Sequence, residues 1–352
     1  MAPTAALTPT KANRCSMSSR PRSSPTPEKR TPKGLSERDA SLILLEDHWT
    51  AMERELVPGA PTERDTLRAM TRIRWCPRVF RSTCLILLSL TLASSATGGC
   101  SDAPRPGPVT LRVMSYNIHH GEGTDGAFDY ERIAAVINEQ QPDLVALQEV
   151  DRKTTRAGGI DQAAKIADLT DLHHVYGAAM DYAGGAYGEA ILSRWPILAS
   201  DNHILPKVEG SEPRALLTVR LAPPGGQELV FAGTHLAHDS ERDRTAQTRL
   251  IDEILETRPY AGAPIFLAGD LNAKPGSAPM DVLLESGDWI DAFEGDPRPT
   301  FPNVKPDRRI DWILVKPRQA RVRIKETHVV EGESASDHCA VVVTLEIEFE
   351  GR

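Results

Sequence analysis

The chain has 352 residues, and its charge is divided unevenly along the sequence. Residues 1–99 carry 15 basic and 9 acidic side chains, whereas residues 100–352 carry 26 and 40, a net charge of −14. Such an acidic domain repels polyanions, which disfavours non-specific nucleic-acid binding without excluding a local basic groove. Cys339 is the only cysteine after Cys100, so the sequence excludes an internal disulfide and a cysteine metal cluster from this domain.

Residues 1–69 are rich in Pro, Ser, Thr and Arg. This composition buries too little apolar surface to offset the entropy of ordering, so it predicts a disordered extension. A second explanation is that translation starts at Met70 and that residues 1–69 are an artefact of the assigned start.

Residues 70–100 have the pattern of a signal peptide. Four arginines follow Met70, an apolar run covers residues 84–93, and small residues precede Cys100. The apolar run is too short to span a bilayer comfortably, and its alternative is a buried core helix. The tetrapeptide Thr97-Gly98-Gly99-Cys100 resembles a bacterial lipobox, although Thr97 stands where leucine is usual. We expect an exported protein, either a periplasmic or cell-envelope lipoprotein attached to the membrane through lipidated Cys100, or a secreted one.

Residues 101–108 form a proline-rich linker, and strand and helix signals alternate after it in a domain that spans residues 109–350. Apolar runs predict strands at residues 109–116, 143–150, 189–192, 214–221, 228–234, 264–268, 310–315 and 340–347. Amphipathic spacing predicts helices at residues 129–140, 161–170 and 242–258. Many strands with few helices predict two packed sheets with the helices outside.

Polar side chains end several of the apolar runs or lie beside them. They are Asn117, Glu149, His235, Asp270, Asn272, Asp311, and Asp337 with His338 in Ser-Asp-His. Strand ends on one rim of a sheet can converge, and converging carboxylates, amides and histidines make a hydrolytic metal site. Each cluster alone is weak evidence, but their occurrence in one chain predicts such a site.

The order of these residues resembles the endonuclease/exonuclease/phosphatase superfamily, which has the DNase I-like fold. The resemblance runs from about Leu111 to Ile347 and rests chiefly on the Gly-Asp-Leu-Asn and Ser-Asp-His motifs. It implies an α/β (α+β) fold, a four-layer sandwich of two packed mixed β-sheets with helices on the outer faces. It also implies divalent-metal-dependent hydrolysis of a phosphodiester or phosphomonoester.

The resemblance and the residue chemistry together suggest which residues hold the metal. Glu149 offers hard oxygen ligands suited to Mg²⁺, with Mn²⁺ as the alternative ion. Asn117 would help to hold the metal or an adjacent ligand, and Asp337 would lean toward the metal. Without the other motifs, Glu149 is a solvated carboxylate at a strand end and Asn117 is a turn residue.

The resemblance also implies roles in catalysis. His338 is the expected general base, and Asp311 would fix its tautomer and raise its basicity. Asp270 would orient the attacking water, Asn272 would donate to a phosphoryl oxygen, and His235 would give the phosphate a charge or a hydrogen bond. The structural alternatives are a packed histidine for His338, an ordinary turn for Gly-Asp-Leu-Asn, and a satisfied histidine at a strand end for His235.

Several further residues have a weaker assignment. Arg156, Asp161 and Arg214 are expected to meet substrate oxygens, with surface charge as an equal alternative. Members of the superfamily often have asparagine where this chain has Glu189. A carboxylate at that position would tighten metal binding or repel the substrate, so it bears on the substrate pocket rather than on the mechanism.

The leading hypothesis is a monomeric, exported, Mg²⁺-dependent phosphoesterase that acts on a small or lipid-linked phosphate ester. The second is a nuclease of the same fold that acts on DNA or RNA. The chain has no obvious basic, aromatic-rich insertion for gripping a duplex, which disfavours the nuclease. The third is a non-catalytic binding module on a degenerate fold, which requires broken motifs, and every main position here is filled.

Overall fold

The computed structural model describes residues 107–225, 227–332 and 334–349. The extension and export signal expected at residues 1–100, and most of the expected linker, lie outside the described residues. Within the described part of the chain, no helix is both long and apolar enough to cross a membrane.

In the described residues, twelve strands form two sheets of six. In the first, the strand order is β11 (Ala320–Val330), β12 (Ala340–Phe349), β1 (Val109–Asn117), β2 (Leu144–Arg152), β4 (Gly185–Ser193) and β3 (His173–Tyr182). In the second, the order is β5 (Ile197–Ile204), β6 (Ala215–Leu221), β7 (Leu229–His235), β8 (Ile265–Asp270), β10 (Asp311–Lys316) and β9 (Ile290–Asp291). Each sheet is mixed, because β1 with β2 and β7 with β8 are parallel while the other pairs are antiparallel.

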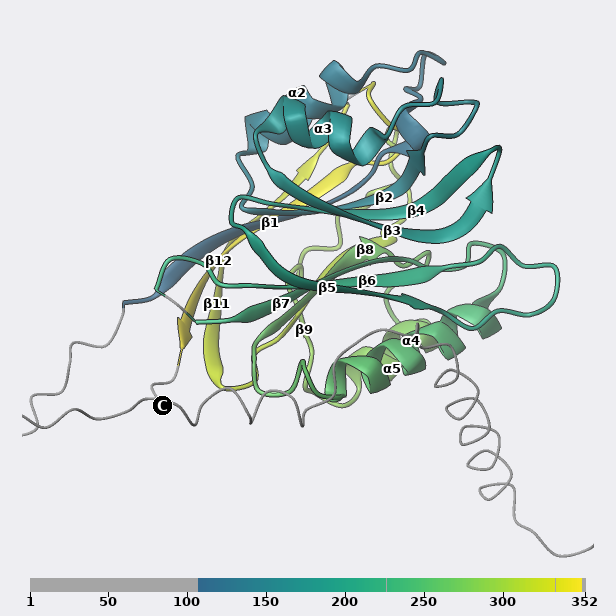
Figure 1. Ribbon diagram of the computed structural model, residues 1–352. Coiled ribbons are helices and arrows are strands. Elements are labelled where there is room, and N and C mark those ends of the chain that lie inside the picture. The colour runs from purple at the N-terminus through teal and green to yellow at the C-terminus, as the bar shows by residue number, and fades with distance from the viewer. Residues whose placement is uncertain (1–106, 226, 333, 350–352) are drawn as a thin grey trace, which may run out of the picture. The chain divides into compact units, whose positions relative to one another are not determined.

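Helices cover the outer face of each sheet (Figure 1). α2 (Tyr130–Gln140) and α3 (Gln162–Thr170) pack on the first sheet, and α4 (Glu241–Glu256) and α5 (Ala278–Leu284) pack on the second. α2, α3 and α4 begin at polar residues whose side chains accept hydrogen bonds from free N–H groups of the first turn, as helix N-caps do. The predicted four-layer sandwich is confirmed.

The central core lies between the two sheets. Side chains from β1 such as Leu111 and Val113 meet Leu217 of β6, Phe231 of β7 and Phe266 of β8, and all five are buried. Each such side chain contributes roughly 1.5–3 kcal/mol on burial. This layer holds the sheets at a fixed separation, and two further apolar clusters attach the outer helices.

The strand directions bring the functional residues to one end of the sandwich. Because β1 and β2 are parallel, Asn117 and Gln148 end up paired, with Glu149 next in sequence. His235 and Asp270 are likewise paired at the ends of β7 and β8. Since β10 runs antiparallel to β8, it starts at this end, and its first residue, Asp311, pairs with Asp270.

Candidate active site

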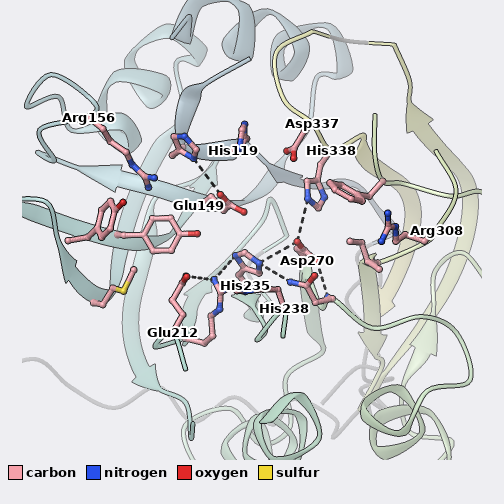
Figure 2. Close-up of a pocket in the computed structure, with 18 of the residues that line it drawn as sticks. His119, Glu149, Arg156, Glu212, His235, His238, Asp270, Arg308, Asp337 and His338 are labelled. Carbon is pink, nitrogen blue, oxygen red and sulfur yellow. Dashed lines mark hydrogen bonds and ion pairs between the residues drawn. The ribbon is translucent and has the colours of Figure 1, made fainter. Parts of the chain in front are cut away.

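A pocket of about 530 Å³ opens where these strand ends meet (Figure 2). Of the residues predicted from the sequence, it is lined by Glu149, Arg156, Arg214, His235, Asp270, Asn272, Asp337 and His338. Asn117 and Asp311 are buried behind this lining and are hydrogen-bonded to it. Asp161 lies elsewhere.

Asn117 joins the two sheets at the base of the pocket. Its Nδ2 atom donates to Glu149 Oε1 at 3.0 Å and to Asp270 Oδ2 at 3.2 Å. Its Oδ1 atom accepts from the backbone N–H of His119 at 3.0 Å. Both N–H groups of the amide are therefore paired, and through them Asn117 positions Glu149 and Asp270.

Backbone strain accompanies these contacts. Glu149 has φ 60° at an irregularity in the β2–β4 pairing, and Asn272 has φ 47°. His119 and His120 have φ 46° and 45°. Left-handed conformations are uncommon for residues other than glycine and gather at functional sites. At Glu149 this irregularity within β2 accompanies a side chain that lines the pocket, although its neighbours in the strand are buried.

Gly269 permits the close pairing of β7 with β8. A Cβ atom at this position would overlap the Thr234 carbonyl oxygen. Only glycine lets the two backbones approach so closely, and the adjacent residues His235 and Asp270 are thereby brought to 3.4 Å between Nε2 and Oδ2. The glycine of the Gly-Asp-Leu-Asn motif is thus explained by the close packing of β7 against β8.

Two carboxylates in the pocket fit a hard divalent cation. Glu149 lines it, and burial would raise its pKa, but the His120 imidazole 3.7 Å away and the Asn117 amide hold that pKa well below its usual range. Asp337 also lines the pocket, and its buried Oδ1 atom has no hydrogen-bond partner within the described residues. An ionised carboxylate and an unpartnered carboxylate oxygen are the ligands that Mg²⁺ or Mn²⁺ prefers.

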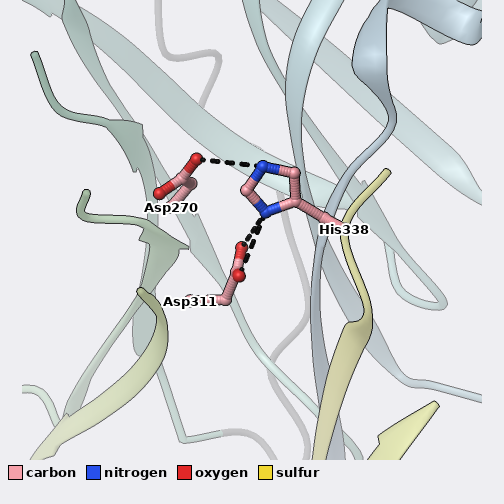
Figure 3. A group of neighbouring side chains, drawn as sticks. All are labelled: Asp270, Asp311 and His338. Carbon is pink, nitrogen blue, oxygen red and sulfur yellow. Dashed lines mark hydrogen bonds and ion pairs between the residues drawn. The ribbon is translucent and has the colours of Figure 1, made fainter. Parts of the chain in front are cut away.

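Asp270, Asp311 and His338 form a second group, with one ligand atom from each lying within 4.8 Å of the others (Figure 3). These atoms already pair with one another. His338 Nδ1 is 3.1 Å from Asp311 Oδ2, and Nε2 is 3.6 Å from Asp270 Oδ2. Since this group is satisfied internally and the oxygen of Asp337 is not, Glu149 and Asp337 are the carboxylates with oxygen atoms free to hold a metal.

The charge state of His338 differs from that of a ready general base. Burial alone would lower its pKa, but the carboxylates of Asp311 and Asp270 outweigh burial and raise the pKa to about 10. Burial likewise raises the pKa of Asp270 to about 7, although the positive charge of His338 opposes this. At neutral pH the ring of His338 is therefore protonated, and Asp270 is the group with a pKa suited to accepting a proton.

His235 is held neutral by its surroundings. Burial, followed by the neighbouring Arg214 guanidinium, lowers its pKa well below the usual value. Arg214 Nη1 donates to His235 Nδ1 at 2.9 Å, so the ring proton is on Nε2, which faces Asp270. The side-chain amide of Asn272 also contacts this ring, 3.0 Å from Nε2, and its Nδ2 atom donates to the Leu236 carbonyl oxygen at 3.1 Å. Arg214 therefore acts by fixing the tautomer of His235, as well as by lining the pocket.

Two residues singled out from the sequence, Asp161 and Glu189, do not line the pocket. Asp161 does not face the pocket, because its side chain accepts from the Ala164 N–H at the start of α3 and forms an ion pair with Arg152 at 3.1 Å. Glu189 is buried and does not line the pocket, and burial raises its pKa well above the usual value. An enclosed carboxyl that does not line the pocket is not placed to contact the substrate or a metal there.

Other residues of the pocket were missed or left open from the sequence. His238, Glu212, Phe301, Lys274 and Arg308 line it and lie on loops. Their only signal is proximity in sequence to a motif, as for His238 three residues after His235. His119 and His120, whose sequence His-His-Gly alone fits a pocket wall, a second metal contact or a loop, do line the pocket.

Known proteins give this arrangement a context. The profile of the endonuclease/exonuclease/phosphatase family matches residues 114–338, which is more than half of the chain. The chain belongs to this family. The family consists of hydrolases that act on phosphoester bonds. The predicted membership is thus confirmed.

Curated relatives and solved structures agree with this assignment. Uncharacterized protein YbhP of Escherichia coli is 28% identical over 218 residues, covering 59% of this chain and 85% of that protein. The inositol phosphosphingolipids phospholipase C of Schizosaccharomyces pombe is 26% identical over 204 residues, covering 52% of this chain and 46% of that protein. A crystal structure of an endonuclease/exonuclease/phosphatase from Beutenbergia cavernae has a TM-score of 0.55 and 28% identity, covering 69% and 72% of the two chains. The mannosyl-6-phosphatase of Bacteroides thetaiotaomicron shares the fold, with a TM-score of 0.55 at 22% identity and coverage of 67% and 99%.

Proposed function

We propose that this member of the family is a divalent-metal-dependent phosphoesterase that hydrolyses a small or lipid-linked phosphate ester. The observation that carries the proposal is that one pocket holds Glu149, the unpartnered oxygen of Asp337, Asp270 and His338. When bound, Mg²⁺ or Mn²⁺ would neutralise phosphoryl oxygens and lower the pKa of a bound water. The name of the fission-yeast relative, a phospholipase C, supports the lipid-linked branch.

The residues of the chain divide the remaining work. Asp270 takes the proton of the attacking water, because its raised pKa suits that task and three groups orient its carboxylate: the Asn117 amide, the Asn272 N–H and the His235 ring. Protonated His338, held by Asp311, stabilises negative charge on the phosphoryl group as it develops. Asp270 thus takes the proton-accepting role that the family resemblance implies for His338.

The test of this function is removal of the Glu149 charge. Glu149→Gln preserves the shape, and we expect it to lower metal-dependent turnover of bis-p-nitrophenyl phosphate or p-nitrophenyl phosphate by about 100-fold or more. Glu139→Gln, an exposed glutamate on α2, is the matched control and should retain full turnover. Unchanged turnover of Glu149→Gln at saturating Mg²⁺ would remove Glu149 from the site.

The nuclease of the same fold is tested in the same panel. Plasmid DNA and RNA, each with and without Mg²⁺, serve as the nucleic-acid substrates. The net charge of −14 over residues 100–352 leads us to expect little cleavage of either and little binding at physiological salt. Faster turnover of DNA or RNA than of the small esters would select the nuclease.

We also propose that the protein is exported and anchored by lipid at Cys100. The support is the sequence of residues 70–100, with its basic, apolar and small-residue segments. Cys100→Ser should release the protein from membranes or block its processing, because the lipid chains supply the anchor. Fractionation of cells expressing the full chain measures this, and normal processing with retained membrane attachment would exclude the lipid anchor.

A further inference from the structure

One wall of the pocket has no role in the hydrolysis described above. It is formed by Arg156, Met180, Tyr182 and Tyr187, which we call the Arg156 wall. Arg156 lies across the pocket from Asp337 and His338, with Glu149 between them (Figure 2). A substrate whose phosphate sits at Glu149 can therefore extend its alcohol portion toward this wall.

Arg156 is fixed in place. Its Nε and Nη2 atoms donate to Asp151 at 2.6 and 2.9 Å, and the Asp151 side chain is fully buried. Thr154 Oγ1 donates to the same carboxylate at 2.7 Å. The guanidinium also stacks over the rings of Tyr182 and Tyr187, with centroids 4.6 and 5.5 Å away. Because these contacts already hold the guanidinium in one conformation, a ligand that binds it causes little further loss of side-chain entropy.

The paired donors leave one nitrogen for a ligand. Nη1 makes no hydrogen bond within the described residues, although the side chain of Arg156 is 29% exposed and lines the pocket. Beside it, Met180 and the edges of the tyrosine rings offer apolar contact. The wall thus combines a rigid hydrogen-bond donor with surfaces that cover C–H groups.

The charge of the wall is balanced. The bidentate carboxylate of Asp151 cancels the guanidinium of Arg156, and Glu212 Oε1 lies 3.0 Å from Arg214 Nη1 on the adjoining side of the pocket. A second phosphate on the substrate would require an uncompensated cation here. Neutral hydroxyl groups need only donors and acceptors, and they suit a wall without net charge.

We propose that the Arg156 wall binds the alcohol portion of the substrate and that this portion is a neutral cyclic polyol, as in a hexose phosphate or an inositol-containing phosphodiester. The inference rests on the proposed function and narrows its substrate class. Arg156 donates through Nη1 to ring hydroxyls, while Tyr182, Tyr187 and Met180 cover the C–H face. The shared polyol chemistry has a soluble source and a lipid source, which the experiment separates.

The experiment compares esters that share the phosphate and differ in the alcohol. The soluble pair is hexose 6-phosphate and ethyl phosphate, with hexose 1,6-bisphosphate as a third ester. The lipid pair is phosphatidylcholine vesicles with and without phosphatidylinositol. We expect the wild-type protein to prefer the polyol member of one pair by about 10-fold or more in kcat/KM, since a site built for hydroxyls rejects an analogue that lacks them. The pair with this preference identifies the source.

Two variants test the wall. Arg156→Met and Tyr182→Ala should each lower kcat/KM for the polyol ester by about 10-fold and lower it much less for the simple ester. Tyr182 is 39% exposed and holds no buried charge, so its variant stays informative if Arg156→Met, which strands Asp151, fails to fold. Arg152→Met is the matched control, because Arg152 also pairs with a carboxylate and stacks on a tyrosine, Tyr176, but lies outside the pocket.

Three outcomes would overturn the proposal for the Arg156 wall without overturning the proposed function. The first is an equal loss on polyol and simple esters in both variants, which would make the wall purely structural. The second is a preference for the bisphosphate over the monophosphate that Arg156→Met abolishes, which would make the wall a second phosphate site. The third is hydrolysis of p-nitrophenyl esters with no polyol preference, which leaves the proposed function standing. If no ester is hydrolysed, the proposed function fails together with the proposal for the Arg156 wall.

Discussion

At the scale of single residues, the site is governed by competition between burial and charge. His338 is enclosed enough for burial to favour its neutral form, yet two carboxylates keep it protonated, with a pKa of about 10. Thr300 Oγ1 donates to Asp311 Oδ2 at 2.6 Å and so holds that carboxylate in place. The sequence motifs indicated that Asp270, Asp311 and His338 lie close together. They could not reveal whether the His338 ring is protonated, because that depends on the charges that surround it.

Asp311→Asn tests the charge on His338. In the metal-free protein, the pKa of His338 is raised above its unfolded value of about 6.5. The stability from this pair is therefore fully present below about pH 6.5 and is lost as pH rises through about 10. We expect the stability deficit of Asp311→Asn, measured by urea unfolding with a chelator present, to be largest near pH 6 and to shrink toward pH 10.

Nuclear magnetic resonance provides the direct check. The ring of His338 in the metal-free wild-type protein should remain protonated at pH 8, and Asp311→Asn should lower its titration midpoint. A midpoint near 6.5 in the wild-type protein would restore His338 as the general base.

At the scale of elements, the strands that the sequence predicts and those that it misses differ in position. The central strands β1, β2, β6, β7, β8, β10 and β12, and part of β4, are predicted from apolar runs. The four missed strands, β3, β5, β9 and β11, are the four sheet edges. Edge strands face solvent and therefore alternate or mix polar residues, as the exposed residues of β5 and β11 show. An apolar-run criterion cannot detect them.

The distinction between central and edge strands also explains which site residues could be predicted from the sequence. Asp270, at the end of β8, and Glu149, after the apolar first half of β2, are predictable because a polar side chain after a buried apolar run is conspicuous. The Arg156 wall is built from the edge strand β3, the neighbouring strand β4 and the loop between β2 and α3. Only the fold brings Tyr182 and Tyr187 to the guanidinium of Arg156, so their joint role has no signature in the sequence.

At the scale of the whole domain, the site is divided between the two sheets. Asn117 and Glu149 come from the first sheet, and Asp270 and Asp311 come from the second. The hydrogen bond from Asn117 to Asp270 and the ion pair of His338 with Asp311 both cross the interface. The distances between metal ligands and the proton acceptor therefore depend on how the sheets pack.

Phe231→Leu tests this dependence, because Phe231 is fully buried between the sheets. It should lower stability by about 1 kcal/mol and also lower kcat by about 5-fold or more, since small misplacements of catalytic groups are costly. Ile137→Val, on the buried face of the outer helix α2, should lower stability by about the same amount with a loss in kcat below about 2-fold. Equal kcat losses at equal stability would show that sheet separation does not control the site.

The crossing hydrogen bond of Asn117 has one further consequence. A phosphate ester bound in the pocket would contact residues of both sheets at once, so its binding would link the two sheets. Amide protons of β1 and β8 should then exchange more slowly together when ester and metal are bound, although these strands belong to different sheets. The ligand would thus act as a structural member of the domain as well as its substrate.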